Sequence, residues 1–283
     1  RKVHANSKVI TTVAGICDPG SSGYLGDNVS AISTKLYSPT AIAVKNNGAI
    51  VIADSNNHRI RQVDTNEIIT TIVGGGASGF SGVSSIAIDA RLNNPKSVTT
   101  TNDGAIIISD YGNRKIRKVD RNGIVTVIAG SGAKGFGGDG GSALNAFLNN
   151  AGKVVVTDDG DVLFADTGNN RIRKVLGSGA IVTVAGDGTT GFTNDGVLAT
   201  QTALNRPRSV AYKNGEVFIA DTGNHRVIKI LSDGTTETVA GSGTSGYSGD
   251  GGLAIHAELN EPVSIVVNSS GKIFISDEGN HIV

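Results

Sequence analysis

The feature that most constrains this chain is a short segment that recurs at nearly constant spacing. It reads "VIADSNNHRIRQV" at 51–63, and its further copies stand at 107–119, 163–175, 218–230 and, incomplete, 274–283. The aspartate of each copy follows the previous one by 56, 56, 55 and 56 residues. Self-similarity at a fixed period marks a repeat architecture. The chain is therefore expected to fold as a series of equivalent units.

Each period predicts four short β-strands. In the first period these strands cover 40–44, 49–54, 59–63 and 68–74. The first two are joined by turns such as "NNG" or "NDG", which supply the positive φ angles of tight hairpins. A four-stranded antiparallel meander repeated radially is a β-propeller blade. We therefore predict an all-β fold: a single β-propeller over 1–283 with five four-stranded antiparallel blades, in repeats of about 16–74, 75–130, 131–186, 187–241 and 242–283.

The two ends of the chain fit together in this pattern. The sequence stops at "DEGNHIV" (277–283), inside an expected third strand, and "RKV" (1–3) supplies the positions that follow in the other copies. The segment "VITTVAG" (9–15) matches a fourth strand. We expect residues 1–15 to complete the last blade and remove both free sheet edges. The alternative is that the chain is one slice of a longer array.

A second module of constant length links each fourth strand to the next first strand. Its copies are "GYLGDNVSAISTKLYSP" (23–39), 79–95, 135–151, 191–207 and 246–262. The second position of each copy is an aromatic residue, and a leucine stands near the end of the copy. These two side chains are expected to anchor a long crossing loop, because burying one such side chain stabilises the fold by about 1.5–3 kcal/mol. A lone loop aspartate, such as Asp139, is expected to shape the loop by hydrogen bonds.

These two modules resemble the NHL-repeat family. The string Asp-x-Gly-Asn-His-Arg-Val at 221–227 and the loop pattern "GDGG…A…LN.P" carry the resemblance, which covers essentially the whole chain. Val83, Ala151 and Ile282 depart from the pattern. The resemblance implies a propeller of five or six blades and a role in binding more often than in catalysis. Contexts in the family include protein or RNA binding, extracellular adhesion domains and a peptide-amidating lyase.

The recurring polar residues of the motif are expected to be structural. An aspartate before a turn can accept backbone N–H groups, and an asparagine follows it three residues later. These residues are Asp54, Asp110, Asp166, Asp221, Asp277, Asn57, Asn113, Asn169, Asn224 and Asn280. His58, His225 and His281 recur nearby but alternate with Arg114 and Asn170, which argues against a metal set. No catalytic residue, metal site or cofactor is predicted.

A candidate binding rim combines aromatic and basic residues that recur with the blades. Its members are Tyr24, Phe80, Phe136, Phe192, Tyr247, Arg59, Arg61, Arg117, Arg171 and Arg173. The rings can either pack under the crossing loops or form a platform, and the cations can either be solvated or face an anionic partner. A protein or polysaccharide partner is expected, with self-association as a further option.

Net charge and local motifs bear on the class of partner and on the cellular location. Net charge is zero, with 25 basic and 25 acidic residues, which makes nucleic acid an unlikely partner because phosphate contacts need positive charge. No stretch approaches the roughly 20 apolar residues of a membrane span. Asn28 and Asn268 stand in N-glycosylation patterns, which favour an extracellular or cell-surface location.

The leading hypothesis is a non-enzymatic extracellular propeller that serves as a macromolecular interaction module or scaffold. Three alternatives remain open: a structural building block of a longer NHL-repeat array or filament, a metal-dependent lyase or hydrolase on an NHL-like propeller, and an RNA-binding protein. Fold alone does not choose among them.

Overall fold

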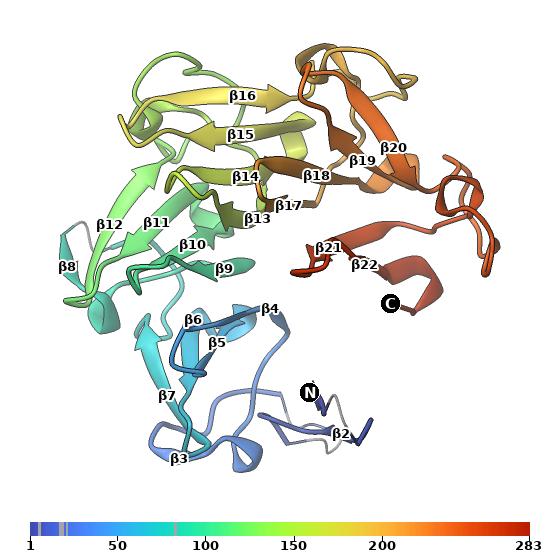
Figure 1. Cartoon of the computed structure of the whole chain (residues 1–283). Coiled ribbons are helices and arrows are strands. Elements are labelled where there is room, and N and C mark those ends of the chain that lie inside the picture. The colour runs from blue at the N-terminus through green and yellow to red at the C-terminus, as the bar shows by residue number, and fades with distance from the viewer. Residues whose placement is uncertain (5–6, 17–19, 21, 82–83) are drawn as a thin grey trace. The chain divides into compact units, whose positions relative to one another are not determined.

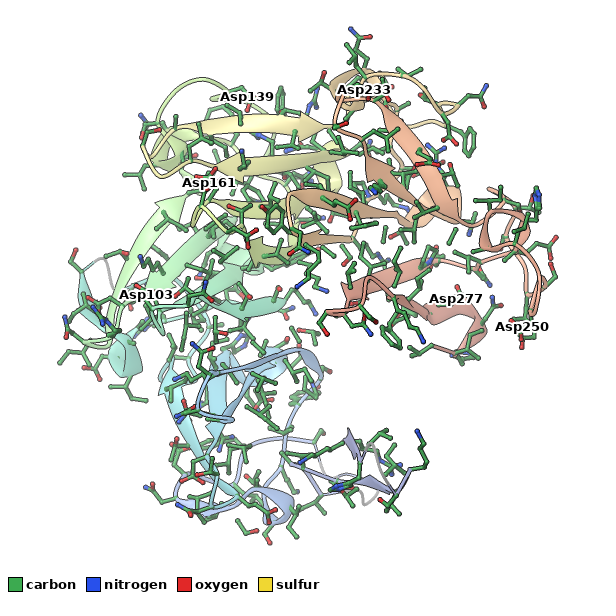
Figure 2. All side chains as sticks on the ribbon, in the orientation of Figure 1. Asp103, Asp139, Asp161, Asp233, Asp250 and Asp277 are labelled. Atoms are coloured by element: carbon green, nitrogen blue, oxygen red, sulfur yellow. The ribbon has the colours of Figure 1, made fainter. Side chains whose placement is uncertain are left out.

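The computed structural model describes residues 1–4, 7–16, 20, 22–81 and 84–283, which form β-strands joined by short 3-10 helices (Figure 1). The chain divides into two compact units, Arg1–Val127 and Ile128–Val283. Loop aspartate Asp139 and the last motif aspartate, Asp277, are labelled in Figure 2, and both belong to the second unit.

The first unit holds two antiparallel sheets and a small hairpin. The first sheet has the order β3 (Val29–Ser30), β7 (Ile68–Val73), β6 (Arg59–Val63), β5 (Ile50–Asp54), β4 (Pro39–Val44). The second has the order β8 (Ser85–Ile86), β12 (Ile124–Ala129), β11 (Lys115–Val119), β10 (Ile106–Asp110), β9 (Ser97–Thr100). The hairpin pairs β1 (Lys2–Val3) with β2 (Ile10–Thr11). In both sheets the extra two-residue strand comes from the crossing loop and covers the edge of the fourth strand.

The second unit repeats the same meander. One sheet runs β13 (Ala151–Val156), β14 (Val162–Asp166), β15 (Arg171–Val175), β16 (Ile181–Ala185). The next runs β17 (Ser209–Lys213), β18 (Glu216–Asp221), β19 (Arg226–Ile230), β20 (Thr236–Ala240). A two-stranded sheet follows, β21 (Pro262–Val267) with β22 (Ile273–Asp277).

Successive sheets pack face to face within each unit. Their first strands lie side by side: β4 with β9 in the first unit, and β13 with β17 and β17 with β21 in the second. Between the sheets the alternating strand residues form the core: Val51 and Ile106 belong to one buried cluster, and Leu163 and Val210 belong to another. This is the packing of propeller blades, and it confirms the predicted all-β, propeller-like class.

The prediction of five complete blades is wrong for the described part of the chain, which contains four complete blades. The fifth repeat contributes only β21 and β22, because the sequence reaches Val283 at the start of its third strand. The N-terminal strands pair with each other as β1 and β2 in a sheet of two strands.

Candidate functional site

The recurring aspartate and asparagine form a buried clamp in every repeat. In the third blade, Oδ1 of Asp166 accepts the backbone N–H of Asn149 at 2.8 Å, and its Oδ2 accepts Nδ2 of Asn169 at 2.7 Å. The same Nδ2 donates to the carbonyl of Gly135 at 2.6 Å. Equivalent pairs are Asp54–Asn57, Asp110–Asn113, Asp221–Asn224 and Asp277–Asn280. Each clamp therefore ties both ends of a crossing loop to the turn between the second and third strands.

A fully buried arginine completes the clamp. Arg173 lies 3.3 Å from Asp166 Oδ2 and 2.6 Å from Oδ1 of the loop aspartate Asp139, and none of its side chain is exposed. Arg61 bridges Asp27 and Asp54 in the same way, and Arg117 pairs with Asp110. The prediction that Arg61, Arg117 and Arg173 lie on an accessible rim is therefore corrected, since burial between two elements leaves them no solvent-facing surface.

In the fourth blade the buried arginine comes from a different position of the repeat. Ile228 occupies the place of the buried arginine, while Arg226, two residues earlier, places its Nε 3.0 Å from Asp221. Arg226 is 1% exposed. In the four complete blades a guanidinium therefore reaches the motif aspartate from either of two positions in the repeat.

Burial and hydrogen bonding act on the clamp carboxylates in opposite directions. Burial raises the pKa of Asp166 to about 6, although Asn149, Asn169 and Arg173 all stabilise its charged form. Arg173, 3.3 Å away, supplies the charge that compensates the ionised form of Asp166.

The recurring aromatic residues are partly exposed, and Tyr24, Phe80, Phe136 and Phe192 are covered on one face by a cation. The guanidinium carbon lies 3.7 Å from the ring centroid for Arg171 over Phe136 and 4.0 Å for Arg59 over Tyr24. Phe80 lies under Lys115 and Phe192 under Arg226. The exposed fractions are 37% for Tyr24, 43% for Phe80, 42% for Phe136, 52% for Phe192 and 61% for Tyr247. The rings thus anchor the loops and still present surface to solvent.

The residue after each motif asparagine adopts the left-handed conformation. At His58, Asn170 and His225 the side chain of this residue also joins neighbouring repeats, because it accepts a backbone N–H from the next crossing loop. His58 Nδ1 accepts from Asn94 at 3.0 Å, and His225 Nδ1 from Glu261 at 3.2 Å. Asn170 Oδ1 accepts from Arg206 at 2.9 Å. These histidines act as hydrogen-bond acceptors between blades.

This contact predicts a pH-dependent stability that resides in His58. Burial, and then the charge of Arg59, lower the pKa of His58 from 6.5. The unfolded chain therefore binds a proton more readily, so this contribution to stability is complete above pH 6.5 and is lost as the pH falls toward the lower folded pKa. When the pH is lowered from 7.5 to 5.5, the melting temperature of the wild type should fall more than that of His58→Asn.

Asparagine is the matched replacement because Asn170 makes the same contact in the third repeat without a titrating group. The buried aspartates contribute the opposite trend and are common to both proteins, so the difference between the two profiles isolates His58. Parallel profiles would contradict the assignment.

Sequence reasoning missed a recurring apolar position on the crossing loops. Each loop contains a 3-10 helix: η1 (Ala31–Ser33), η3 (Ala87–Asp89), η5 (Ala143–Asn145), η7 (Ala199–Gln201) and η9 (Ala254–His256). Their second residues include Ile32, Ile88, Leu144 and Ile255, which are 52%, 41%, 50% and 44% exposed. The signal in the sequence was an alanine followed by a large apolar residue at the same place in four loops.

Two features bear on ligands and membranes. In the described part of the chain, no group of three or more His, Cys, Asp and Glu side chains is placed to hold a metal ion. None of the helices in the same residues is long and apolar enough to span a bilayer.

Two family models match the sequence. The teneurin NHL domain model matches residues 1–84, and the NHL repeat model matches residues 204–230. Both matched segments carry the motif described above, because the first includes the clamp of Asp54 and the second that of Asp221.

Two relatives and one solved structure show the breadth of the likeness. The chain is 27% identical over 253 residues to Protein SUPPRESSOR OF QUENCHING 1, chloroplastic, of Arabidopsis thaliana, covering 83% of this chain and 23% of the relative. It is 38% identical over 118 residues to human Teneurin-4, covering 37% of this chain and 4% of the relative. The chain thus spans less than a quarter of the length of either relative. The virginiamycin B lyase of Staphylococcus aureus superposes with a TM-score of 0.53 at 14% identity, covering 84% of this chain and 63% of the lyase, which is a likeness of fold.

Proposed function

Because the chain belongs to the NHL-repeat family, we propose that it is a non-enzymatic protein-interaction module that works outside the cell. The clamp aspartates, asparagines and arginines are engaged in holding the blades, so they are not available for chemistry on a ligand. The zero net charge supports a protein partner over a nucleic acid. The likeness to a teneurin NHL domain supports the extracellular setting.

The observation that carries the proposal is the exposed apolar position on the crossing loops. In the second unit, Leu253 is the N-cap of η9 and Ile255 lies within η9, and they are 67% and 44% exposed. In the first unit, Ile86 and Ile88 repeat the arrangement at 59% and 41%. A single exposed apolar residue is ordinary, but contiguous exposed apolar surface marks interaction sites.

The test is a binding screen with a paired loss-of-binding variant. The protein is immobilised and measured by biolayer interferometry against a panel of purified secreted and cell-surface ectodomains. We expect at least one ectodomain to bind, and Leu253→Ser/Ile255→Ser to weaken it at least about tenfold, as hot-spot truncations of 1.4 kcal/mol or more do.

Thr200→Ser is the matched control, because Thr200 occupies the same loop position as Ile255 without an apolar side chain. Its binding should equal that of the wild type, and all three proteins should melt alike. A panel without any binder, or a double variant that binds normally, would reject the proposal.

A second candidate is a structural building block in a longer repeat array. It is favoured by uncovered apolar sheet residues: Ile42 and Val44 of β4 are 65% and 60% exposed, and Val266 and Phe274 of the last sheet are 54% and 49% exposed. Light scattering should then show mass rising with concentration, and Ile42→Ser/Val44→Thr should reduce it. A constant monomer mass would reject this candidate.

The extracellular setting predicts unequal glycosylation of the two acceptor sites. Asn28 is exposed. Asn268 is half-buried, and its Oδ1 accepts the N–H groups of Ser270 and Lys272 at 3.0 and 2.9 Å. We expect glycan mainly on Asn28 when the chain is secreted from a glycosylating cell, measured by mass spectrometry of peptides from wild type and Asn28→Gln. Higher occupancy at Asn268 would contradict this order.

A further inference from the structure

A small hollow in the second unit is not accounted for by the clamps or the apolar loop positions. It lies between the third and fourth blades, at the hairpin turns that join their first and second strands. Its volume is about 260 Å³. Sites for drug-sized molecules begin at roughly 300 Å³. The hollow is therefore suited to a single long side chain rather than to a cofactor.

The floor and the rim of the hollow differ in chemistry. The floor consists of Leu163, Val184 and Val217, and Leu163 is 1% exposed. Tyr212 forms one wall, and its hydroxyl donates to Oδ2 of Asp158 at 3.2 Å. An apolar floor can take up methylene groups, as it does for buried stems of lysine and arginine.

The rim has a surplus of negative charge. Asp159 and Asp161 line it, and Asp158 stands directly beside them. The opposing cation among the lining residues is Lys174, whose Nζ lies 3.3 Å from Oδ2 of Asp161. Among the lining residues, one ammonium thus faces two carboxylates, which leaves one negative charge in excess. Asp161 is labelled in Figure 2, directly before β14.

The other repeats show that the hairpin does not need these acids. The positions of Asp158, Asp159 and Asp161 hold Asn46, Asn47 and Ala49 in the first repeat and Ser269, Ser270 and Lys272 in the last. Tyr212 likewise replaces Val44, Thr100 and Val156. The second repeat keeps one acid, Asp103, at the position of Asp159. The combination of two acids with a tyrosine wall is therefore particular to this junction between blades.

We propose that the hollow receives one lysine or arginine side chain of a partner protein. The methylene stem packs on Leu163, Val184 and Val217, and the cationic end lies among the carboxylates of Asp159 and Asp161. The proposal rests on the proposed function only in that a protein partner supplies the side chain.

The test uses small probes that do not depend on knowing the partner. N-acetyl-lysine amide, N-acetyl-arginine amide and N-acetyl-norleucine amide are titrated into the isotope-labelled protein, and backbone amide shifts are followed by NMR. We expect the lysine or arginine probe to shift the amides of 157–161, 184 and 212–217 at millimolar concentration, while the norleucine probe does not. Raising NaCl from 0.05 to 0.5 M should weaken the effect, because exposed charge pairs are screened.

Two variants and one control make the result specific. Asp159→Asn should weaken the cationic probe about two- to fivefold, the range for an exposed ion pair. Asp159→Lys places a cation at the mouth and should abolish binding. Asp103→Asn, at the same position of the second repeat, should change nothing. Shifts elsewhere, equal shifts with norleucine, or equal loss in Asp103→Asn would overturn the proposal.

These outcomes separate the hollow from the wider function. If the probe binds but no ectodomain does, the proposed site for a lysine or arginine side chain is supported and the proposed protein-interaction function is rejected. If an ectodomain binds the wild type and Asp159→Lys equally and the probe does not bind, the protein-interaction function is supported and the proposed side-chain site in the hollow is rejected.

Discussion

Replacing Arg173 by alanine is expected to lower the free energy of unfolding by about 3–5 kcal/mol, because it leaves a buried carboxylate without its counter-charge. Asp166 is 0% exposed and has Arg173 as its ion-pair partner at 3.3 Å. For a chain of this size, each kcal/mol shifts the melting temperature by about 2–4 °C. The melting temperature measured by calorimetry should therefore fall by about 6–20 °C.

Arg171→Ala is the matched control in the same strand. Arg171 stacks on Phe136 and donates to backbone carbonyls, but it is only partly buried and leaves no buried carboxylate unpaired. Its loss should cost about 1 kcal/mol. If both variants have the same melting temperature, Arg173 does not make the larger contribution to the free energy of unfolding that is expected here.

The second large effect is expected at Gly186, where the fourth strand of the third blade ends. Its φ is +93°, and a Cβ there would lie 2.2 Å from the carbonyl oxygen of Asn170 and 2.9 Å from the Cα of Arg171. Both contacts are with backbone, which cannot turn aside. Gly186→Ala should therefore cost about 3 kcal/mol or more, as strain and overpacking add, and should lower the midpoint of urea unfolding.

Gly179→Ala separates the clash from the backbone conformation. Gly179 has a φ of +84°, but a Cβ there would meet nothing within 4 Å. Its cost should be limited to the left-handed conformation, about 1–2 kcal/mol. Equal urea midpoints for the two variants would contradict the prediction, because they would show that the backbone shifts to relieve the clash between the new Cβ and the carbonyl oxygen of Asn170.

The strands could be predicted because alternation and Asn-Gly turns act within a few residues, and the repeat shows them five times. The motif aspartate was expected to bind the N–H groups of its own turn, whereas Asp166 accepts the N–H of Asn149 from the crossing loop. The buried position of Arg173 could not be predicted this way. A basic residue in an alternating strand suggests a solvated face, and only the crossing loop, 34 residues away, provides Asp139 as its second partner.

The remaining differences also come from contacts between elements. Arg226 stands two positions from the expected site, since the length of its side chain lets another register reach Asp221. The hollow combines residues from two blades, so no single repeat shows it. The number of complete blades was overestimated because the fifth repeat contributes two strands, β21 and β22, in the described residues.

The side-chain acceptor that the first, third and fourth repeats offer to the next one has a consequence for how such a chain can change length. Asn170 binds the loop of the fourth repeat and His225 that of the fifth, with the same geometry. Removing residues 187–241 would place Asn170 opposite Glu261, whose backbone N–H occupies the equivalent position. Loss of this whole period therefore preserves the junction made by Asn170, whereas a deletion or insertion of another length moves the acceptor away from its partner N–H.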